Sequence, residues 1–287
     1  MVRPPAVAAV LAAGRRHSLA RRADGLVVAV GHDGAGECRV QGWTDVVAVA
    51  AGAVHVARNT GRSHSVGLRG DGTVLATGWA TDGQCDVDRW EDMVAVAAGW
   101  RFTLGLDGAG RVVATGRSRE GQCRVDGWRD VVDVACGDWH AVAARTDGTV
   151  VAAGSNARGQ GNVKDWHDVV AVSAGHLHTV GLTAQGRVVA VGDRSSGACD
   201  VVPWEDVAML SAGSRHTVGV TASGRVLAVG DDSRGQCAVD GWRDVVAVAA
   251  GSAHTLGLRR DGTVLATGDD RDGQCGVGSW PQVRAAD

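Results

Sequence analysis

Six histidines occupy one recurring position in this sequence, and histidine is the side chain that most often binds metals or moves protons near neutral pH. Each begins a short apolar run, such as "HTLGL" at 254–258, and Phe102 takes the place of a seventh. The six are His17, His64, His140, His178, His216 and His254. If each copy belongs to its own sheet, neighbouring copies lie on the order of 10 Å apart, whereas a metal–nitrogen bond is about 2 Å long. We therefore expect no metal but a structural role, a hydrogen bond to a neighbouring turn, at a position that accepts any flat ring.

Cysteine also recurs at one position, which raises the question of disulfides. The copies are Cys38, Cys85, Cys123, Cys199, Cys237 and Cys275, and Cys136 stands apart from them. A disulfide needs two Cα atoms within about 7 Å, which equivalent positions on separate sheets do not provide. We expect reduced, buried thiols that act as small apolar side chains, which is typical of a cytoplasmic protein.

Four further residues could transfer protons: Asp133, Asp138, His55 and His176. Asp133 replaces an alanine that most copies of its segment carry, so its carboxylate should be solvated or paired. The sequence shows no nucleophile elbow, phosphate-binding loop, dinucleotide fingerprint or usable pair of zinc ligands. We assign none of the four as catalytic, and we expect no cofactor.

These residues are set in a repeat of 38 residues. Tryptophan marks it at Trp43, Trp90, Trp128, Trp166, Trp204, Trp242 and Trp280, with a longer first step. That longer step places a nine-residue insertion in the second repeat, around 53–61. Seven repeats with this insertion account for nearly all 287 residues, so we expect a single domain over 1–287.

Each repeat contains several short β-type segments and no helical periodicity. "DVVAVAAG" predicts a strand of small residues, "HTLGL" a second strand and "TVLATG" a third, and "GQC" begins a fourth. An Asp-Gly turn separates the second and third. Four short antiparallel strands in every repeat are typical of propeller blades. The sequence therefore predicts an all-β, seven-bladed β-propeller with the small-residue strands at its axis.

The repeat also resembles a known family. Gly-x-x-His-Thr-x-x-Leu, then Asp-Gly-x-Val, then Gly-x-x-x-x-Gly-Gln is similar to the regulator of chromosome condensation repeat, and "GQC" with short loops resembles its bacterial branch. The resemblance implies a seven-bladed propeller. It also implies several functions: nucleotide exchange on a small GTPase, β-lactamase inhibition, or ultraviolet-light sensing, since "GWRFT" at 99–103 resembles a motif of the plant UV-B photoreceptor.

Comparison of the repeats with one another separates the constant positions from the variable ones. The first variable loop is the pair of residues before the repeat histidine, and the second variable loop lies between "TG" and "GQ". In a strand meander both loops lie at the same end of the blade, so they should form one face. The variable residues that we expect to bind a partner are Trp100, Arg101, Trp139, Asp138, His176, Arg15, Arg16, Arg62, Arg215 and Trp79, with His55, Arg58 and Asn59 from the insertion. Tryptophan and arginine are the residues most enriched in binding hot spots.

Composition limits the partners. The formal charge is −3, which gives no overall basic surface for nucleic acid or anionic lipid. No run of apolar residues is long enough to cross a membrane, and we interpret the alanine-rich start as a strand rather than a targeting segment.

Two functions follow as hypotheses. The first is a binding module that docks a protein or peptide, or less readily a small molecule, on the variable face. The alternative is a cofactor-independent enzyme with a pocket on that face or in the central channel, using Asp133, Asp138, His55 or His176. A tryptophan-based ultraviolet sensor is a third.

Overall fold

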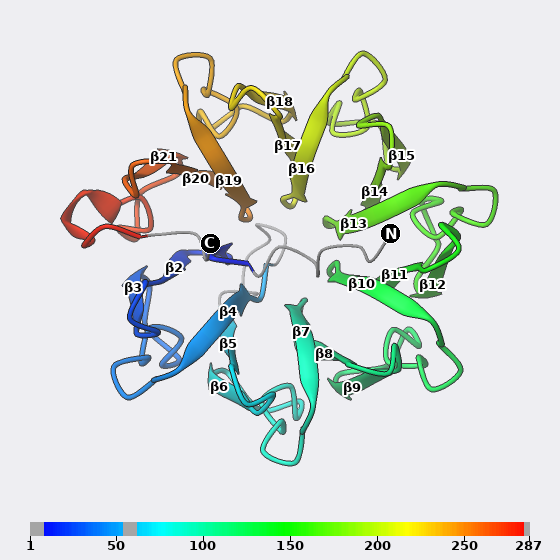
Figure 1. Ribbon diagram of the computed structural model, residues 1–287, viewed down its shortest axis with the longest axis horizontal. Helices are drawn as coiled ribbons and strands as arrows, with labels where there is room; N and C mark the ends of the chain where they lie inside the picture. The colour runs from blue at the N-terminus through cyan, green and yellow to red at the C-terminus, as the bar shows by residue number, and fades with distance from the viewer. Residues whose placement is uncertain (1–8, 54–61, 284–287) are drawn as a thin grey trace.

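The computed structural model describes residues 9–53 and 62–283. These residues form seven three-stranded antiparallel sheets arranged as blades around a central axis (Figure 1). In every sheet the strands follow one another in chain order, from an inner strand at the axis to an outer strand at the rim. The predicted seven-bladed propeller is therefore confirmed.

The blades, numbered one to seven in chain order, share one pattern of strands. The inner strands are β1 (Leu11–Ala13), β4 (Val46–Ala51), β7 (Met93–Ala98), β10 (Val131–Cys136), β13 (Val169–Ala174), β16 (Val207–Ala212) and β19 (Val245–Ala250). The middle strands are β2 (His17–Arg21), β5 (His64–Arg69), β8 (Phe102–Asp107), β11 (His140–Arg145), β14 (His178–Thr183), β17 (His216–Thr221) and β20 (His254–Arg259). The outer strands are β3 (Val27–Gly31), β6 (Val74–Gly78), β9 (Val112–Gly116), β12 (Val150–Gly154), β15 (Val188–Gly192), β18 (Val226–Gly230) and β21 (Val264–Gly268). A single 3₁₀ turn, η1 (Val277–Ser279), is the one helical element of the described residues, and it is far too short to cross a bilayer.

The prediction of a fourth strand was wrong. In blade three the segment after β9 forms consecutive turns, in which the Gly121 N–H donates to Ser118 O and the Arg124 N–H to Gly121 O. The turns continue to the Trp128 N–H, which donates to Val125 O. Backbone donors that are used locally cannot also form a ladder with the outer strand, so the blade ends at three strands.

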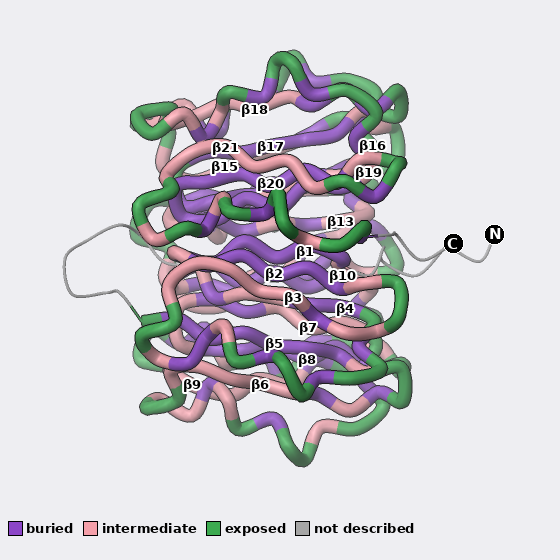
Figure 2. The backbone as a smooth tube through the Cα atoms, turned by 90° about the vertical axis from the view of Figure 1, so that its left-hand side faces the viewer, coloured by how far each residue is buried: buried purple, intermediate pink, exposed green. Residues whose placement is uncertain are grey.

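The middle strands form the most buried layer. Figure 2 shows the buried residues along the strands and the exposed ones at the turns on either side. Most middle-strand residues are buried, whereas the outer strands are largely half-buried. The inner strands are rich in alanine, as their convergence on the axis requires.

The recurring tryptophan packs onto the next blade. The Trp43 ring lies against Gly67 of β5 so closely that a Cβ there would be 2.7 Å from the ring. Trp90 and Gly105 repeat this contact one blade further on. Glycine at this position is therefore set by the space that the tryptophan takes rather than by a positive φ.

The repeat histidines join neighbouring blades through side-chain hydrogen bonds. The His140 Nε2 is 2.9 Å from the Thr179 Oγ1 of the next blade, and that hydroxyl also bonds to Gln160 O at 2.7 Å. A hydroxyl has one hydrogen, and Gln160 O can only accept it, so the histidine Nε2–H must be the donor to Thr179. Both the neutral and the charged ring can carry this hydrogen, but burial lowers the pKa of His140 to about 4, which keeps the imidazole neutral near pH 7.

Five more blade interfaces contain the same bond. The pairs are His17–Ser65, His64–Thr103, His178–Thr217, His216–Thr255 and His254–Ser18. Only the interface between blades three and four lacks it among the described residues. There Phe102 replaces the histidine and Ala141 replaces the hydroxyl partner, and both belong to one apolar cluster.

The last of those pairs also closes the ring. Ser18 accepts from His254 and bonds to Gln274 O at 2.8 Å, and Val10, Val283 and Trp280 share one core cluster. All three strands of blade one come from the start of the chain. Blades one and seven are therefore joined by side-chain contacts and by the bond from the Ser252 N–H to Gly14 O at 3.1 Å, rather than by a shared strand.

The repeat cysteines are less buried than the sequence predicts. Five of the six repeat cysteines are half-buried rather than buried, and the Cys123 Sγ donates to Arg117 O at 3.3 Å.

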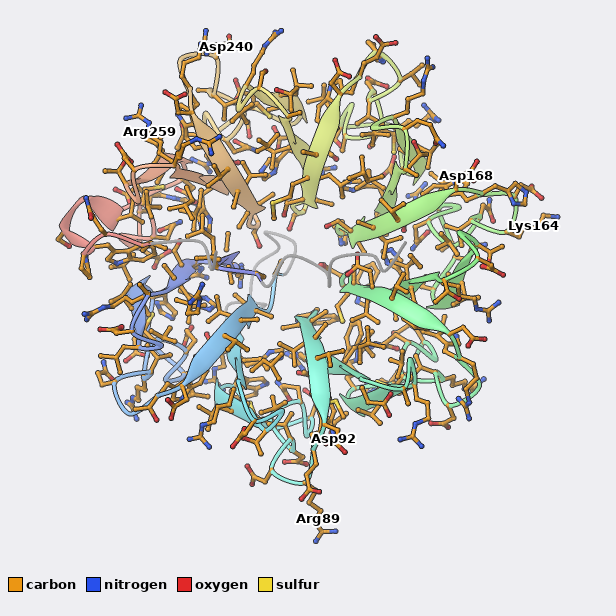
Figure 3. All side chains as sticks on the ribbon, viewed as in Figure 1. Arg89, Asp92, Lys164, Asp168, Asp240 and Arg259 are labelled. Carbon is orange, nitrogen blue, oxygen red and sulfur yellow. The ribbon has the colours of Figure 1, made fainter. Side chains whose placement is uncertain are left out.

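The aspartates that precede the inner strands, such as Asp92 and Asp168, adopt φ near +59°, a conformation that aspartate tolerates better than most residues. Figure 3 shows these two at the outer ends of β7 and β13, with Arg89 and Lys164 pointing outward at the periphery.

Candidate binding face

The two variable loops of each blade lie at the same end of the ring. The Trp79 N–H, in the second variable loop of blade two, donates to Ser63 O in the first loop at 2.7 Å. The Arg117 N–H donates to Arg101 O at 2.8 Å in blade three. The repeated backbone bond means that the variable side chains share one face, which we call the variable face.

On one side of this face, three aromatic side chains from three successive blades touch in sequence. The rings of Trp100 and Trp139 meet edge to face with centroids 5.9 Å apart. Trp139 and His176 meet in the same way at 5.0 Å. We call Trp100, Trp139 and His176 the aromatic cluster. All three are half-buried, so each keeps part of its surface available for contact.

Asp138 fixes the end of the cluster. Its Oδ2 is 2.8 Å from the His176 Nδ1, and its side chain is only 2% exposed. A carboxylate at that distance holds the imidazole in one orientation and favours a proton on Nδ1. In that tautomer Nε2 carries no hydrogen and is the acceptor nitrogen of the ring.

Two guanidinium groups lie over the other end of the cluster. Arg101 and Arg117 place their Cζ atoms 4.9 and 4.7 Å from the centre of the Trp100 ring. Arg101 bonds to Asp82 at 3.2 Å, and Arg117 bonds to Glu120 at 2.6 Å. Arginine over an indole gains about 0.5–1 kcal/mol when exposed and about 2 kcal/mol when desolvated. The stacking keeps a cationic surface in place.

Arg101 is also strained. Its φ of +66° makes it the one residue other than glycine or the repeated aspartates with a positive φ among the described residues. This conformation costs a bulky residue about 1–2 kcal/mol. In this conformation Arg101 contacts both Asp82 and Trp100, and backbone strain of this kind clusters at functional sites.

The other predicted binding residues are spread around the same face. The Arg62 guanidinium lies 4.1 Å from the centre of the Trp79 ring, in blade two. In blade one, Arg15 is buried and Arg16 is 3.7 Å from Asp272 of blade seven. Arg215 is exposed in blade six and follows Ser214, whose carbonyl accepts the His176 N–H at 3.2 Å. His55, Arg58 and Asn59 lie outside the described residues.

Asp133 is separate from this face. It lies on β10 in the central channel, and its Oδ2 accepts from the Val172 N–H of the next inner strand at 2.8 Å. Burial raises the pKa of Asp133 to about 7. The channel is a cavity of about 520 Å³ lined mainly by alanine and valine of the inner strands. Asp133 thus bonds to a backbone N–H in the channel, whereas Asp138 bonds to His176 on the variable face.

Sequence reasoning missed Arg117 as part of the cluster, although it contacts Trp100. The available signal was its place in the second variable loop of blade three, the same blade whose first loop carries Trp100. Asp82 was missed for a similar reason, because its partner Arg101 belongs to the next blade.

These features define the class as a seven-bladed β-propeller in which the strands are nearly uniform and the loops of one face differ. Five segments, 93–122, 131–160, 169–198, 208–236 and 245–274, match the model of the Regulator of chromosome condensation (RCC1) repeat. The chain belongs to this family. The sequence-based resemblance to these repeats is confirmed.

Comparison with known structures supports the same fold. Human WBSCR16 superposes with a TM-score of 0.68 at 19% identity, over 90% of this chain and 88% of that one. Prp20p from Saccharomyces cerevisiae gives 0.63 at 16% identity, over 84% and 77%. A structure of Kap60 bound to yeast RCC1 (Prp20) gives 0.65 at 16% identity, over 84% and 75%. At these identities the likeness concerns the fold alone. No curated protein matched the sequence.

Proposed function

We propose that this propeller is a binding module that docks a protein or peptide on the variable face, with the aromatic cluster at the centre of contact. The observation that carries the proposal is the continuous contact from Trp100 through Trp139 to His176, which spans three blades. None of the three side chains recurs at the equivalent position of the other repeats, so the fold of a blade does not require them. Partly exposed tryptophan beside arginine is the composition of binding hot spots.

Relatives of the same fold are consistent with this proposal. The solved structures include yeast RCC1 (Prp20) in a complex with Kap60, and Prp20p described with binding to Gsp1p and histones. These are properties of those proteins. They support a general use of the fold in protein binding and indicate no particular partner for this chain.

The test is a double substitution, Trp100→Ala with Trp139→Ala, in the full-length protein. A partner is first captured with the tagged wild-type protein, identified and purified, and its affinity for each variant is then measured by calorimetry. Loss of two hot-spot tryptophans should weaken binding by at least about 30-fold, or about 2 kcal/mol. Because both rings lie on loops, the melting temperature should change little.

The matched control is Arg89→Ala with Lys164→Ala. Both side chains are exposed and point outward at the periphery (Figure 3), away from the variable face. This control should bind the partner as the wild type does. Equal affinity for the partner in the wild type and the tryptophan double variant would refute the proposal.

A second candidate is a cofactor-independent enzyme, and the contact between Asp138 and His176 favours it. A buried carboxylate that orients a histidine is the arrangement by which a general base is held ready. A panel of chromogenic esters and amides would test it. Turnover that is lost in His176→Ala and kept in Asp133→Asn would support this candidate, and absence of turnover across the panel would count against it.

A further inference from the structure

Several N–H groups of the arginines and tryptophans in blades two and three find no acceptor within the described part of the chain. Three N–H groups there are buried and have no acceptor among the described residues: Trp79 Nε1, Arg101 Nε and Arg117 Nη1. Arginine and tryptophan side chains can only donate. A ligand that satisfies such a surface must therefore bring acceptors.

Positive and negative side chains are distributed unevenly around the variable face, with the excess of positive charge near the same arginines. In the described variable loops of blades two to four, five arginines face three carboxylates: Arg62, Arg101, Arg117, Arg119 and Arg158 against Asp82, Glu120 and Asp138. In those of blades six and seven, three arginines face five aspartates: Arg215, Arg234 and Arg271 against Asp231, Asp232, Asp269, Asp270 and Asp272. The aromatic side of the face thus has a net positive charge, and the opposite side has a net negative charge.

The two guanidinium groups over Trp100 carry like charges, and together they favour the binding of an anion. Arg101 and Arg117 both lie within 5 Å of one ring, so two like charges are held close together. Each has one carboxylate partner, Asp82 or Glu120. The side chains of Arg101 and Arg117 remain 29% and 12% exposed. A change of rotamer, which is common at interfaces, can turn the buried N–H of each toward an incoming carboxylate.

From these observations we propose that the partner of this face presents an acidic peptide segment, whose carboxylates bind Arg101 and Arg117 while its backbone or apolar groups lie on the aromatic cluster. The inference rests on the proposed binding function and specifies the chemistry of the ligand. Carboxylates supply only acceptors, and their hydrogen bonds with arginine are roughly twice as strong as bonds between neutral groups.

The same surface is a poor match for nucleic acid. Binding along a phosphate backbone needs a continuous basic track, whereas Asp82, Glu120 and Asp138 interrupt this one. The acidic loops of blades six and seven would repel a long polyanion that crossed the ring. A short acidic segment can bind the arginines of blades two and three and avoid both groups.

The experiment is fluorescence anisotropy with three fluorescein-labelled probes: a decapeptide of alternating glutamate and glycine, the same peptide with lysine, and a ten-nucleotide oligothymidylate. The full-length protein should bind the glutamate peptide, and more weakly as salt is raised. Arg101→Gln and Arg117→Gln should each weaken binding about fivefold, the effect of one screened charge pair. The control Arg271→Gln should bind nearly as tightly as the wild type, because Arg271 is paired with Asp269 in the acidic loop of blade seven, on the other side of the face.

Three results would overturn the inference: equal binding of the lysine peptide, tighter binding of the oligonucleotide, or unchanged binding by the Arg101→Gln, Arg117→Gln double variant. Its failure is distinguishable from failure of the proposed function. A captured partner that depends on Trp100 and Trp139, with no binding of the glutamate peptide, would leave the binding module in place and remove only the acidic ligand.

Discussion

Two neighbouring interfaces of the ring fill equivalent spaces with different side chains. The first lies between blades three and four, and the second between blades four and five. At the second, His140 donates to Thr179, whose hydroxyl bonds in turn to Gln160 O. At the first, Phe102 and Ala141 stand in those two places within an apolar cluster, and Phe102 has no exposed surface. The polar pair has been exchanged as a pair. Replacing both partners of a buried hydrogen bond can be nearly neutral, whereas replacing one leaves a buried polar group without a partner.

The comparison also separates two kinds of change. The exchange of His and Thr for Phe and Ala conserves the packing between two blades. Directly beside it, the loops carrying Trp100 and Trp139 change the chemistry of the variable face. The molecule thus tolerates new surface residues at one end of a blade as long as the volume between the blades is kept.

The largest expected effect is a loss of stability in acid. Burial lowers the pKa values of all six repeat histidines, for example of His17 to about 3 and of His64 to about 4, from an ordinary 6.5. Because these native pKa values are depressed, the unfolded state binds the extra protons, and stability falls as the pH drops from 6.5 toward 4. Six such groups give a slope of up to about 8 kcal/mol per pH unit. Urea unfolding followed by tryptophan fluorescence between pH 8 and pH 5 would measure it.

The Phe102 interface supplies the control for this experiment. Copying it into the next interface, by His140→Phe with Thr179→Ala, removes one titrating group and should lower the slope by about 1.4 kcal/mol per pH unit. Stability that stays constant between pH 7 and pH 5 in the wild type would contradict the assignment of neutral, hydrogen-bonded histidines.

A smaller effect is expected from Phe102→Ala. The ring is fully buried, so its removal should leave a cavity and lower the free energy of unfolding by about 3–5 kcal/mol. Phe102→His should cost less, about 1–3 kcal/mol, because its Nε2–H would meet Ala141 and find no acceptor. Adding Ala141→Thr to Phe102→His should recover most of that loss. Denaturant unfolding at pH 8 tests all three, and a failure of the second substitution to rescue the first would break the comparison.

A smaller effect than that of Phe102→Ala is expected from Thr179→Ala. It leaves the His140 Nε2–H and Gln160 O buried without partners, at a cost of about 2–4 kcal/mol. His140→Phe in the same chain should reduce that cost, and the coupling between the two substitutions should be about 1–3 kcal/mol. Simple additivity in this double-mutant cycle would show that the two interfaces are not interchangeable.

Most of the architecture could be predicted because it depends on spacing within the chain. The 38-residue period of Trp128, Trp166 and Trp204 and the small residues of the inner strands indicate a ring of blades. The fourth strand could not be excluded in this way. Whether the segment after Gly116 pairs with the outer strand depends on competing local turns such as the one closed by Gly121, and residue types alone do not show which of the two wins.

The site was predicted less completely, and for a physical reason. Adjacent repeats place Trp100 and Trp139 in neighbouring blades, so their proximity follows from the period. The stacking of Arg117 on Trp100 depends on how two loops turn toward each other. The partner of Asp133 is a backbone N–H, that of Val172, which has no signature in the sequence. Ala141 opposite Phe102 was visible in the sequence, but only a comparison of each repeat with its neighbour exposes the pairing.

The junction between blades seven and one is built like most of the other six. Among the described residues no blade takes a strand from the other end of the chain, and Val10 and Val283 meet in one core cluster. The assembled ring therefore does not depend on the blade at which the chain begins. A gene rearranged to begin at another blade would therefore encode the same seven blades and the same variable face.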